Sequence, residues 1–185
     1  GEKEVNAVGY CIGGTLLASS LAHMAKRGDT RIKSATFLVT QVDFTEAGEL
    51  KVFIDEEQIA DIEERMHQKG GYLEGSTMAS TFNMLRSNDL IWNADATRLP
   101  SAMHVFYLRQ CYLENRLAEG KMTLAGEELH LHDVKVPVYL QSGRDDHISP
   151  YKSVYKATRL FGGPVRFICA GSGHIAGVIN PPALG

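Results

Sequence analysis

The sequence contains little cysteine and no long apolar run, and these two absences exclude several classes of protein. Its three cysteines, Cys11, Cys111 and Cys169, are far apart and form no C-x-x-C pair. Neither a disulfide framework nor a zinc site is therefore favoured. The longest apolar stretches, such as 136–140, are too short to span a bilayer, and the first residues lack the basic and then apolar pattern of a signal peptide. We expect a soluble, cytoplasmic protein with no membrane span.

The chain also lacks an excess of basic charge. Its 19 basic and 22 acidic residues give a formal net charge of −3, and they are mixed along the sequence rather than clustered. A nucleic-acid-binding surface is therefore not indicated. With 185 residues, 44% of them apolar, the chain is long enough for one domain with a core and an inserted subdomain.

Segments typical of strands and helices alternate near both ends of the chain, and this alternation implies a mainly parallel sheet. In order, the expected elements are a strand at 5–8, a helix at 15–25, a strand at 31–42, a strand at 136–141, a helix at 151–160 and a strand at 165–170.

A long segment, 44–132, separates the two sets of elements. Its charged stretch 55–69 has Ile59, Ile62 and Met66 at helical spacing on one face. We expect 44–132 to form an inserted, mostly helical cap, and 1–43 together with 133–185 to form the core.

The sequence GYCIGG at 9–14 fits G-x-C-x-G, the cysteine form of the nucleophile elbow, and it lies between an expected strand and an expected helix. Glycines suit a strained turn in which the helix packs close to the strand. Cys11 is therefore a candidate nucleophile at a helix start, where a thiolate is stabilised. The backbone N–H of Ile12 is a candidate oxyanion-hole donor. The alternative is a buried structural cysteine beside a glycine turn.

Candidate partners for this cysteine follow later strands in the order acid, then histidine, that the α/β-hydrolase fold requires. Asp146 follows the strand at 136–141, and His174 follows the strand at 165–170. The acid would orient the imidazole while the imidazole takes the thiol proton. His147 is a secondary candidate, but it lies too near Asp146 in sequence for the usual geometry. The alternative for Asp146 is a helix cap ahead of Pro150.

The strand that carries Cys11 begins within a few residues of the start of the sequence. In an α/β-hydrolase sheet such a strand has neighbours on both sides. We therefore expect upstream strands in the intact protein, together with an upstream loop that supplies the second oxyanion-hole donor.

Other residues are weaker candidates for chemistry. His130 and His132 lack an acidic or cysteine partner at ligand spacing, so we expect a surface loop and no metal there. Cys111 and Cys169 are expected in the core. Four aromatic residues are candidates for lining an acyl pocket, although ordinary packing is the commoner role. They are Trp92, Phe106, Tyr107 and Tyr112.

Several longer motifs, together spanning nearly the whole chain, resemble the catalytic domain of class I polyhydroxyalkanoate synthases. They are GYCIGG at 9–14, NDLIW at 88–92, WNADATRLP at 92–100, FYLRQCYLENRL at 106–117, GRDDHISP at 143–150 and SGHIAGVINPP at 172–182.

The resemblance implies that Cys11 is the acylated cysteine, Asp146 the catalytic aspartate and His174 the catalytic histidine. It further implies an acyltransferase that polymerises 3-hydroxyacyl groups, such as 3-hydroxybutyryl groups, from coenzyme A thioesters into polyester and releases coenzyme A. No cofactor is expected beyond the thioester substrate. A homodimer at the surface of cytoplasmic polymer granules is also implied.

The sequence departs from this family in two places. One tryptophan, Trp92, serves two motifs that the family separates, so a stretch is expected to be missing near 91–93. The N-terminal domain and early strands of the family are also absent. Two alternative functions stay open: a cysteine hydrolase of the dienelactone-hydrolase type, and a granule-binding protein without activity. The long excursion between Cys11 and Asp146 argues against such a hydrolase.

Overall fold

The computed structural model describes residues 3–48, 51, 54–74 and 99–179. The chain divides into two compact units, the first containing Gly1–Gly48 and Asn115–Gly185 and the second Glu49–Glu114. These limits place 115–132 with the first unit. The assignment of 44–132 to a cap stays a prediction, and the expected gap near 91–93 lies outside the described residues. In the described ranges, no helix is long and apolar enough to cross a membrane.

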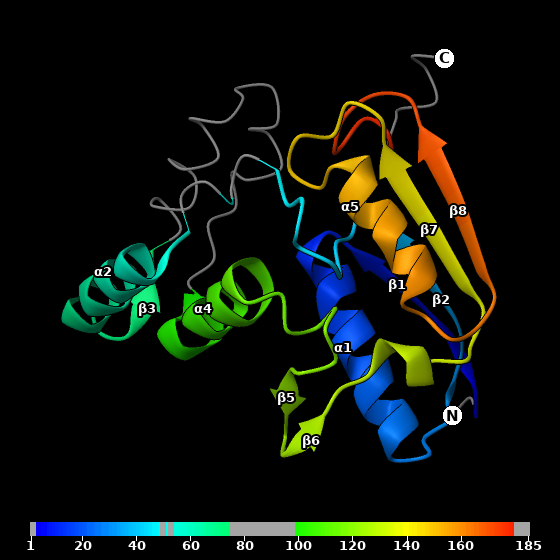
Figure 1. The fold of residues 1–185 in the computed structure, drawn as a ribbon, viewed down its shortest axis with the longest axis horizontal. Coiled ribbons are helices and arrows are strands. Elements are labelled where there is room, and N and C mark those ends of the chain that lie inside the picture. Colours follow the sequence, from blue (N-terminus) through cyan, green and yellow to red (C-terminus); the bar gives the residue numbers. More distant parts are fainter. Residues whose placement is uncertain (1–2, 49–50, 52–53, 75–98, 180–185) are drawn as a thin grey trace. The chain divides into compact units, whose positions relative to one another are not determined.

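The first unit contains a four-stranded parallel sheet with the order β1-β2-β7-β8 (Figure 1). The strands are β1 (Val5–Tyr10), β2 (Ile32–Leu38), β7 (Val138–Gly143) and β8 (Val165–Ala170). Tyr10 is aligned with Leu38, and Gly143 with Ala170, so the carboxyl ends of the strands lie together at one end of the sheet. The parallel sheet predicted from the alternation of elements is confirmed.

Two helices, α1 (Ile12–Lys26) and α5 (Tyr151–Lys156), connect neighbouring strands and lie in front of the sheet in Figure 1. Because connections between parallel strands are right-handed and both advance in one direction, both helices cover the same face. Alternate strand residues on that face are buried, among them Ala35, Phe37, Val138 and Leu140. The ring of Phe161 stacks on that of Phe37 at 5.3 Å between centroids.

Two short elements pack against α1 before the chain enters β7. They are the hairpin of β5 (Thr123–Leu124) with β6 (Glu127–Glu128) and the 3-10 turn η4 (Leu131–Asp133). The sulfur of Met122 contacts the Ser19 hydroxyl of α1 at 3.9 Å, and both residues are buried. This region therefore completes the core on the side of α1.

The end of β2 differs from the predicted strand at 31–42, because β2 stops at Leu38. Val39 has a φ of +45°, which is outside the strand conformation. Beyond it, the hydroxyl of Thr40 lies 3.2 Å from the Cys11 carbonyl oxygen, and the Thr15 hydroxyl donates to the Gln41 carbonyl at 2.7 Å. The chain after Val39 is thus bonded to the start of α1 and not to a neighbouring strand.

Two other predicted boundaries also shift. α1 begins at Ile12 rather than at residue 15, directly after the turn. The predicted helix at 151–160 is α5 followed by the 3-10 turn η5 (Ala157–Arg159). Apolar spacing identifies a helix, but it does not distinguish α from 3-10 geometry in a final turn.

One edge of the described sheet is β1. The side chains of Val8, on β1, and Leu16, on α1, are 68% and 57% exposed. The expected upstream strands would lie beside this edge, and they stay a prediction.

The second unit contains the charged helix predicted at 55–69, observed as α2 (Glu56–Gln68). Asp55 caps it by accepting a hydrogen bond from the Gln58 backbone N–H at 2.8 Å. Ile59 and Met66 are buried, as their spacing predicted. The described part of this unit also contains the paired strands β3 (Tyr72–Leu73) and β4 (Leu99–Pro100). The helix α4 (Ser101–Tyr107) follows β4 and continues as the π-helical segment η3 (Leu108–Leu113).

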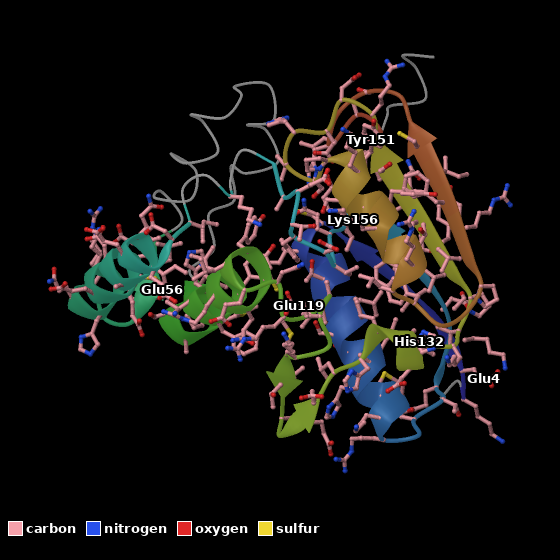
Figure 2. All side chains as sticks on the ribbon, viewed as in Figure 1. Glu4, Glu56, Glu119, His132, Tyr151 and Lys156 are labelled. Carbon is pink, nitrogen blue, oxygen red and sulfur yellow. The ribbon has the colours of Figure 1, made fainter. Side chains whose placement is uncertain are left out.

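Asn115 joins the chain segments that leave and re-enter the first unit. Its side-chain oxygen accepts a hydrogen bond from the Phe44 N–H at 2.8 Å, and its side-chain nitrogen donates to Asp43 at 3.2 Å. The hydroxyl of Ser153, on α5, donates to the Asp43 carbonyl. Lys156, labelled at the end of α5 in Figure 2, pairs with Glu46 at 3.0 Å. Both segments are therefore fixed to the core at one place.

In the turn from β1 to α1, the backbone at Gly9 and at Gly14 lies very close to neighbouring atoms. A Cβ at Gly9 would lie 2.5 Å from the Gly14 Cα, and a Cβ at Gly14 would overlap the side chain of Thr40. By contrast, a Cβ at Gly13, the second glycine of G-x-C-x-G, would meet no described atom within 4 Å. The expectation that close packing requires the glycines is therefore correct for Gly9 and wrong for Gly13. Gly14, just outside the motif, has that role.

We predict that Gly14→Ala lowers the free energy of unfolding by about 1–3 kcal/mol, because the new methyl group collides with the short, buried Thr40 side chain. Gly13→Ala is the matched control, and it should change stability by less than about 1 kcal/mol or raise it, since alanine favours a helix. Denaturant unfolding of both variants measures the difference. Equal losses would contradict this explanation of the turn.

Candidate functional site

Cys11 occupies the turn between β1 and α1 in a conformation that is uncommon for a residue other than glycine. Its φ is 50° and its ψ is −127°. Its N–H donates to the Leu38 carbonyl at 2.9 Å, which extends the β1–β2 ladder by one residue. Its carbonyl accepts hydrogen bonds from the Gly14 and Thr15 N–H groups at 2.9 and 3.3 Å, which begins α1. The cysteine is thus held at a sharp strand-to-helix turn, where the sequence predicted the elbow.

Asp146 and His174 form a buried pair. The Nδ1 of His174 lies 2.7 Å from Oδ2 of Asp146, and the two side chains are 7% and 0% exposed. The other carboxylate oxygen of Asp146 accepts hydrogen bonds from the N–H groups of Ile148 and Ser149 at 2.9 and 2.8 Å. Asp146 therefore orients the imidazole and also bonds the backbone at 148–149, but the alternative of a helix cap is wrong, because α5 has Pro150 as its N-cap and no side-chain cap hydrogen bond.

The loops that carry this pair are tied together at the backbone. The N–H of Asp145 donates to the Ser172 carbonyl at 2.9 Å, and that of Arg144 donates to Ala170 at 2.8 Å. A Cβ at Gly143 would lie 2.8 Å from the Gly173 carbonyl oxygen. The loops after β7 and β8 therefore approach too closely for a side chain at Gly143, and this contact fixes the distance between acid and histidine.

The structure brings Cys11 into the same hydrogen-bonded group. Burial alone would lower the pKa of His174, but hydrogen bonds to Asp146 and Cys11, together with their charges, raise it to about 10. The three predicted triad residues therefore meet at the carboxyl ends of the strands. A histidine in contact with a cysteine, and itself oriented by a carboxylate, is the arrangement that activates a cysteine nucleophile.

The two secondary candidates lie beside this group. Ile12 is the first residue of α1, so its N–H belongs to the helix start, where N–H groups lack partners within the helix. Its role as an oxyanion-hole donor stays a prediction. His147 is half-buried and directly follows Asp146, but the carboxylate oxygen that faces an imidazole is bonded to His174.

The remaining cysteines have different environments. Cys111 is buried, as predicted, and burial raises the pKa of its thiol to about 12. Cys169 is exposed, so the prediction that it lies in the core was wrong. The reason is that β8 is an edge strand of the described sheet.

The described residues contain no cluster of three or more histidine, cysteine or acidic side chains that could hold a metal. His130 instead lies 3.1 Å from the carboxylate of Glu128. Of the aromatic candidates for an acyl pocket, Trp92 lies outside the described residues, whereas Tyr107 and Tyr112 pack edge to face within the second unit at 5.5 Å.

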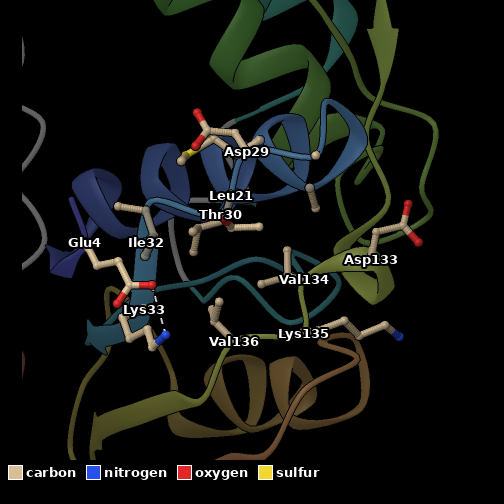
Figure 3. A pocket seen from close by; sticks show the side chains of 13 residues that line it. Glu4, Leu21, Asp29, Thr30, Ile32, Lys33, Asp133, Val134, Lys135 and Val136 are labelled. Atoms are coloured by element: carbon tan, nitrogen blue, oxygen red, sulfur yellow. Dashed lines mark hydrogen bonds and ion pairs between the residues drawn. The ribbon is translucent and has the colours of Figure 1, made fainter.

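A cavity of about 590 Å³ lies in the first unit, near the amino ends of β2 and β7 (Figure 3). It is lined by the start of β2, by the end of α1 and by 133–136, which precede β7. Since the triad residues all follow the carboxyl ends of strands, this cavity is separate from them.

Comparison with known proteins identifies relatives along nearly the whole chain, although no protein-family model matches. The poly(3-hydroxyalkanoate) polymerase subunit PhaC of Rhizobium meliloti is 54% identical over 204 aligned positions, which cover 99% of this chain and 33% of that protein. The poly(3-hydroxyalkanoate) polymerase of Methylorubrum extorquens is 56% identical over 203 positions, covering 98% and 33%. The corresponding PhaC subunit of Cupriavidus necator is 38% identical, covering 99% and 36%. The chain thus spans about one third of these relatives.

The alignments are longer than the 185 residues of this chain, so each relative has residues in the aligned region that have no counterpart here. Among solved structures, a monoacylglycerol lipase from Paleococcus ferrophilus matches with a TM-score of 0.59 and 14% identity, over 94% of this chain and 61% of that one. An esterase from Exiguobacterium antarcticum matches with a TM-score of 0.55 and 15% identity, over 95% and 62%. These matches confirm a partial α/β-hydrolase fold.

We predict that the pair formed by His174 and Asp146 makes stability depend on pH. Because the pKa of His174 is raised to about 10 from an ordinary value of 6.5, its stabilising effect is complete below about pH 6.5 and is lost as pH rises through 10. Asp146→Asn removes the charge, and it should flatten the fall in unfolding free energy between these values. Denaturant titrations of the intact protein across this range test this, with exposed Asp145→Asn as control. Parallel curves for wild type and Asp146→Asn would contradict it.

Proposed function

Because the chain is homologous along nearly its whole length to one third of the poly(3-hydroxyalkanoate) polymerases, we propose that it forms the acyl-transferring part of such an enzyme. Its substrates are 3-hydroxyacyl-coenzyme A, in particular the 3-hydroxybutyryl thioester, and the end of a growing polyester. The observation that carries the proposal is the hydrogen-bonded group of Cys11, His174 and Asp146 at a nucleophile elbow.

In the first step, His174 takes the proton of the Cys11 thiol, and the sulfur attacks the carbonyl carbon of the acyl-coenzyme A. The bond from that carbon to the coenzyme A sulfur breaks, and the imidazolium of His174 gives its proton to the leaving thiolate. The backbone N–H of Ile12 donates to the developing oxyanion. Since one thioester replaces another, the acyl group stays activated for transfer, and no cofactor is needed.

In the second step, a hydroxyl group at the end of the polyester attacks the carbonyl carbon of an acyl thioester. An ester bond forms, the bond from carbon to sulfur breaks, and the thiol is released. His174 is the base that takes the hydroxyl proton. Its assignment is supported by the environment of Asp146, whose carboxylate has no exposed surface and whose two oxygens are already bonded to His174, Ile148 and Ser149. A direct role of Asp146 as the base is therefore less consistent with its contacts.

Water would hydrolyse the acyl-enzyme and end the reaction, so a polymerase must exclude it. We assign this role to the inserted segment 44–132. The same proposal includes a homodimer that acts at the surface of cytoplasmic polymer granules.

We predict that Cys11→Ala abolishes acylation, because it removes the atom that forms the thioester, and that Cys11→Ser lowers acylation by at least about 1000-fold. Intact-protein mass spectrometry after incubation with 3-hydroxybutyryl-coenzyme A detects the bound acyl group. A variant Cys169→Ala, at the exposed cysteine, is the control and should acylate normally.

The products of the same incubation distinguish the alternatives. Polymer and free coenzyme A support the proposal, whereas free 3-hydroxy acid without polymer would indicate a cysteine hydrolase. Full activity of Cys11→Ala would exclude both enzymes that depend on this cysteine.

We predict that His174→Ala slows acylation by about 100- to 10,000-fold, the range for loss of a general base. His147→Ala should slow it much less, since the imidazole of His174 is the one in contact with both Asp146 and Cys11. Rapid-quench measurement of acyl-enzyme formation compares the two variants. A larger loss for His147→Ala would reverse the assignment of the histidine.

A further inference from the structure

Tyr10, the first of the two unspecified residues of G-x-C-x-G, contacts His174 in two ways. Its hydroxyl donates a hydrogen bond to the His174 main-chain carbonyl at 3.1 Å. Its ring meets the imidazole edge to face, with 5.5 Å between centroids and 66° between planes. Since Tyr10 directly precedes Cys11, one side chain connects the end of the nucleophile strand to the loop that carries the histidine.

Two contacts tie the loop that carries His174 to the loop after β7, at the Ser172 and Gly173 carbonyls, but neither involves the main chain of His174 itself. His174 follows Gly171, Ser172 and Gly173, and Ser172 has a φ of +75°. Asp146 holds Nδ1 of the imidazole, which bonds the side chain of His174 and not its main chain. The Tyr10 hydroxyl fixes the carbonyl of the same residue, so the ring and the backbone of His174 are held from two different strands.

From this geometry we infer that Tyr10 is a positioning residue that sets the distance between the Cys11 sulfur and the His174 imidazole. This inference rests on the proposed function for the reaction, but the hydrogen bond itself exists without substrate. A nucleophile and its base must be held closely, because small displacements greatly reduce the rate. Tyr10 acts through His174 and does not contact the acyl group.

The test is Tyr10→Phe in the intact protein, which keeps the aromatic ring and removes only the donor. Loss of one such hydrogen bond should slow acylation of Cys11 by about 2- to 10-fold, with little change in KM for 3-hydroxybutyryl-coenzyme A. The matched control is Tyr155→Phe. Tyr155 is 47% exposed on α5, and its ring packs edge to face on Phe167 at 5.1 Å, so the control also removes a hydroxyl and keeps a ring contact.

The three cysteines provide a second readout that needs no substrate. Under brief iodoacetamide treatment, Cys11 reports the support of its thiolate by His174, exposed Cys169 is an internal reference, and buried Cys111 reports loosening of the fold. In Tyr10→Phe, the ratio of Cys11 to Cys169 alkylation should fall by about 2- to 10-fold while Cys111 stays unmodified. Peptide mass spectrometry measures all three sites in one sample.

Three outcomes would overturn the inference: an unchanged alkylation ratio, an equal fall in Tyr155→Phe, or a fall accompanied by modification of Cys111. Failure of the proposed function gives a different result, in which the wild-type protein takes no acyl group from the thioester. The alkylation ratio still decides the role of Tyr10 in that case.

Discussion

The close approach of β1, α1 and the end of β2 is the constraint on which the rest of the site depends. Gly9 and Gly14 bring the strand and the helix together, and the side chain of Thr40 occupies the space beside Gly14. The chain can only turn sharply there, and Cys11 takes a positive φ as a result. A strained residue persists where its surroundings determine it fully. The packing of Gly9, Gly14 and Thr40 therefore determines where the Cys11 backbone lies, independently of the contact with His174.

The two oxygens of the Asp146 carboxylate have different hydrogen-bond partners. One oxygen of Asp146 bonds to the imidazole, and the other bonds to two backbone N–H groups. A fully buried carboxylate is costly unless its lone pairs are satisfied. The backbone bonds meet that need and also fix the loop after β7. One side chain thus orients the imidazole and also bonds the backbone of the loop after β7.

Most of the core and the site could be predicted from sequence because both depend on local patterns. Apolar spacing located α2, the strand predicted at 165–170 matches β8, and the order Cys11, Asp146, His174 matches the sheet that brings them together. The end of β2 was missed, since Val39 is a good strand residue whose positive φ comes from contacts of the next residues with α1.

Other features depend on neighbours that are distant in sequence. Gly13 and Gly14 are alike in the motif, and only the presence of Thr40 beside one of them distinguishes their roles. Cys169 has the apolar neighbours of a core residue, but it lies on an edge strand. The contact of Tyr10 with His174 joins residues 164 positions apart, and the motif leaves the identity of that residue unspecified.

The bonds of Asn115 to Asp43 and Phe44 have a consequence for how such chains vary in length. They hold together, within the first unit, the two points of the chain between which the segment 45–114 runs. The entropic cost of closing a loop grows only slowly with the length of the loop. Residues can therefore be gained or lost between these anchors at little thermodynamic cost to the sheet.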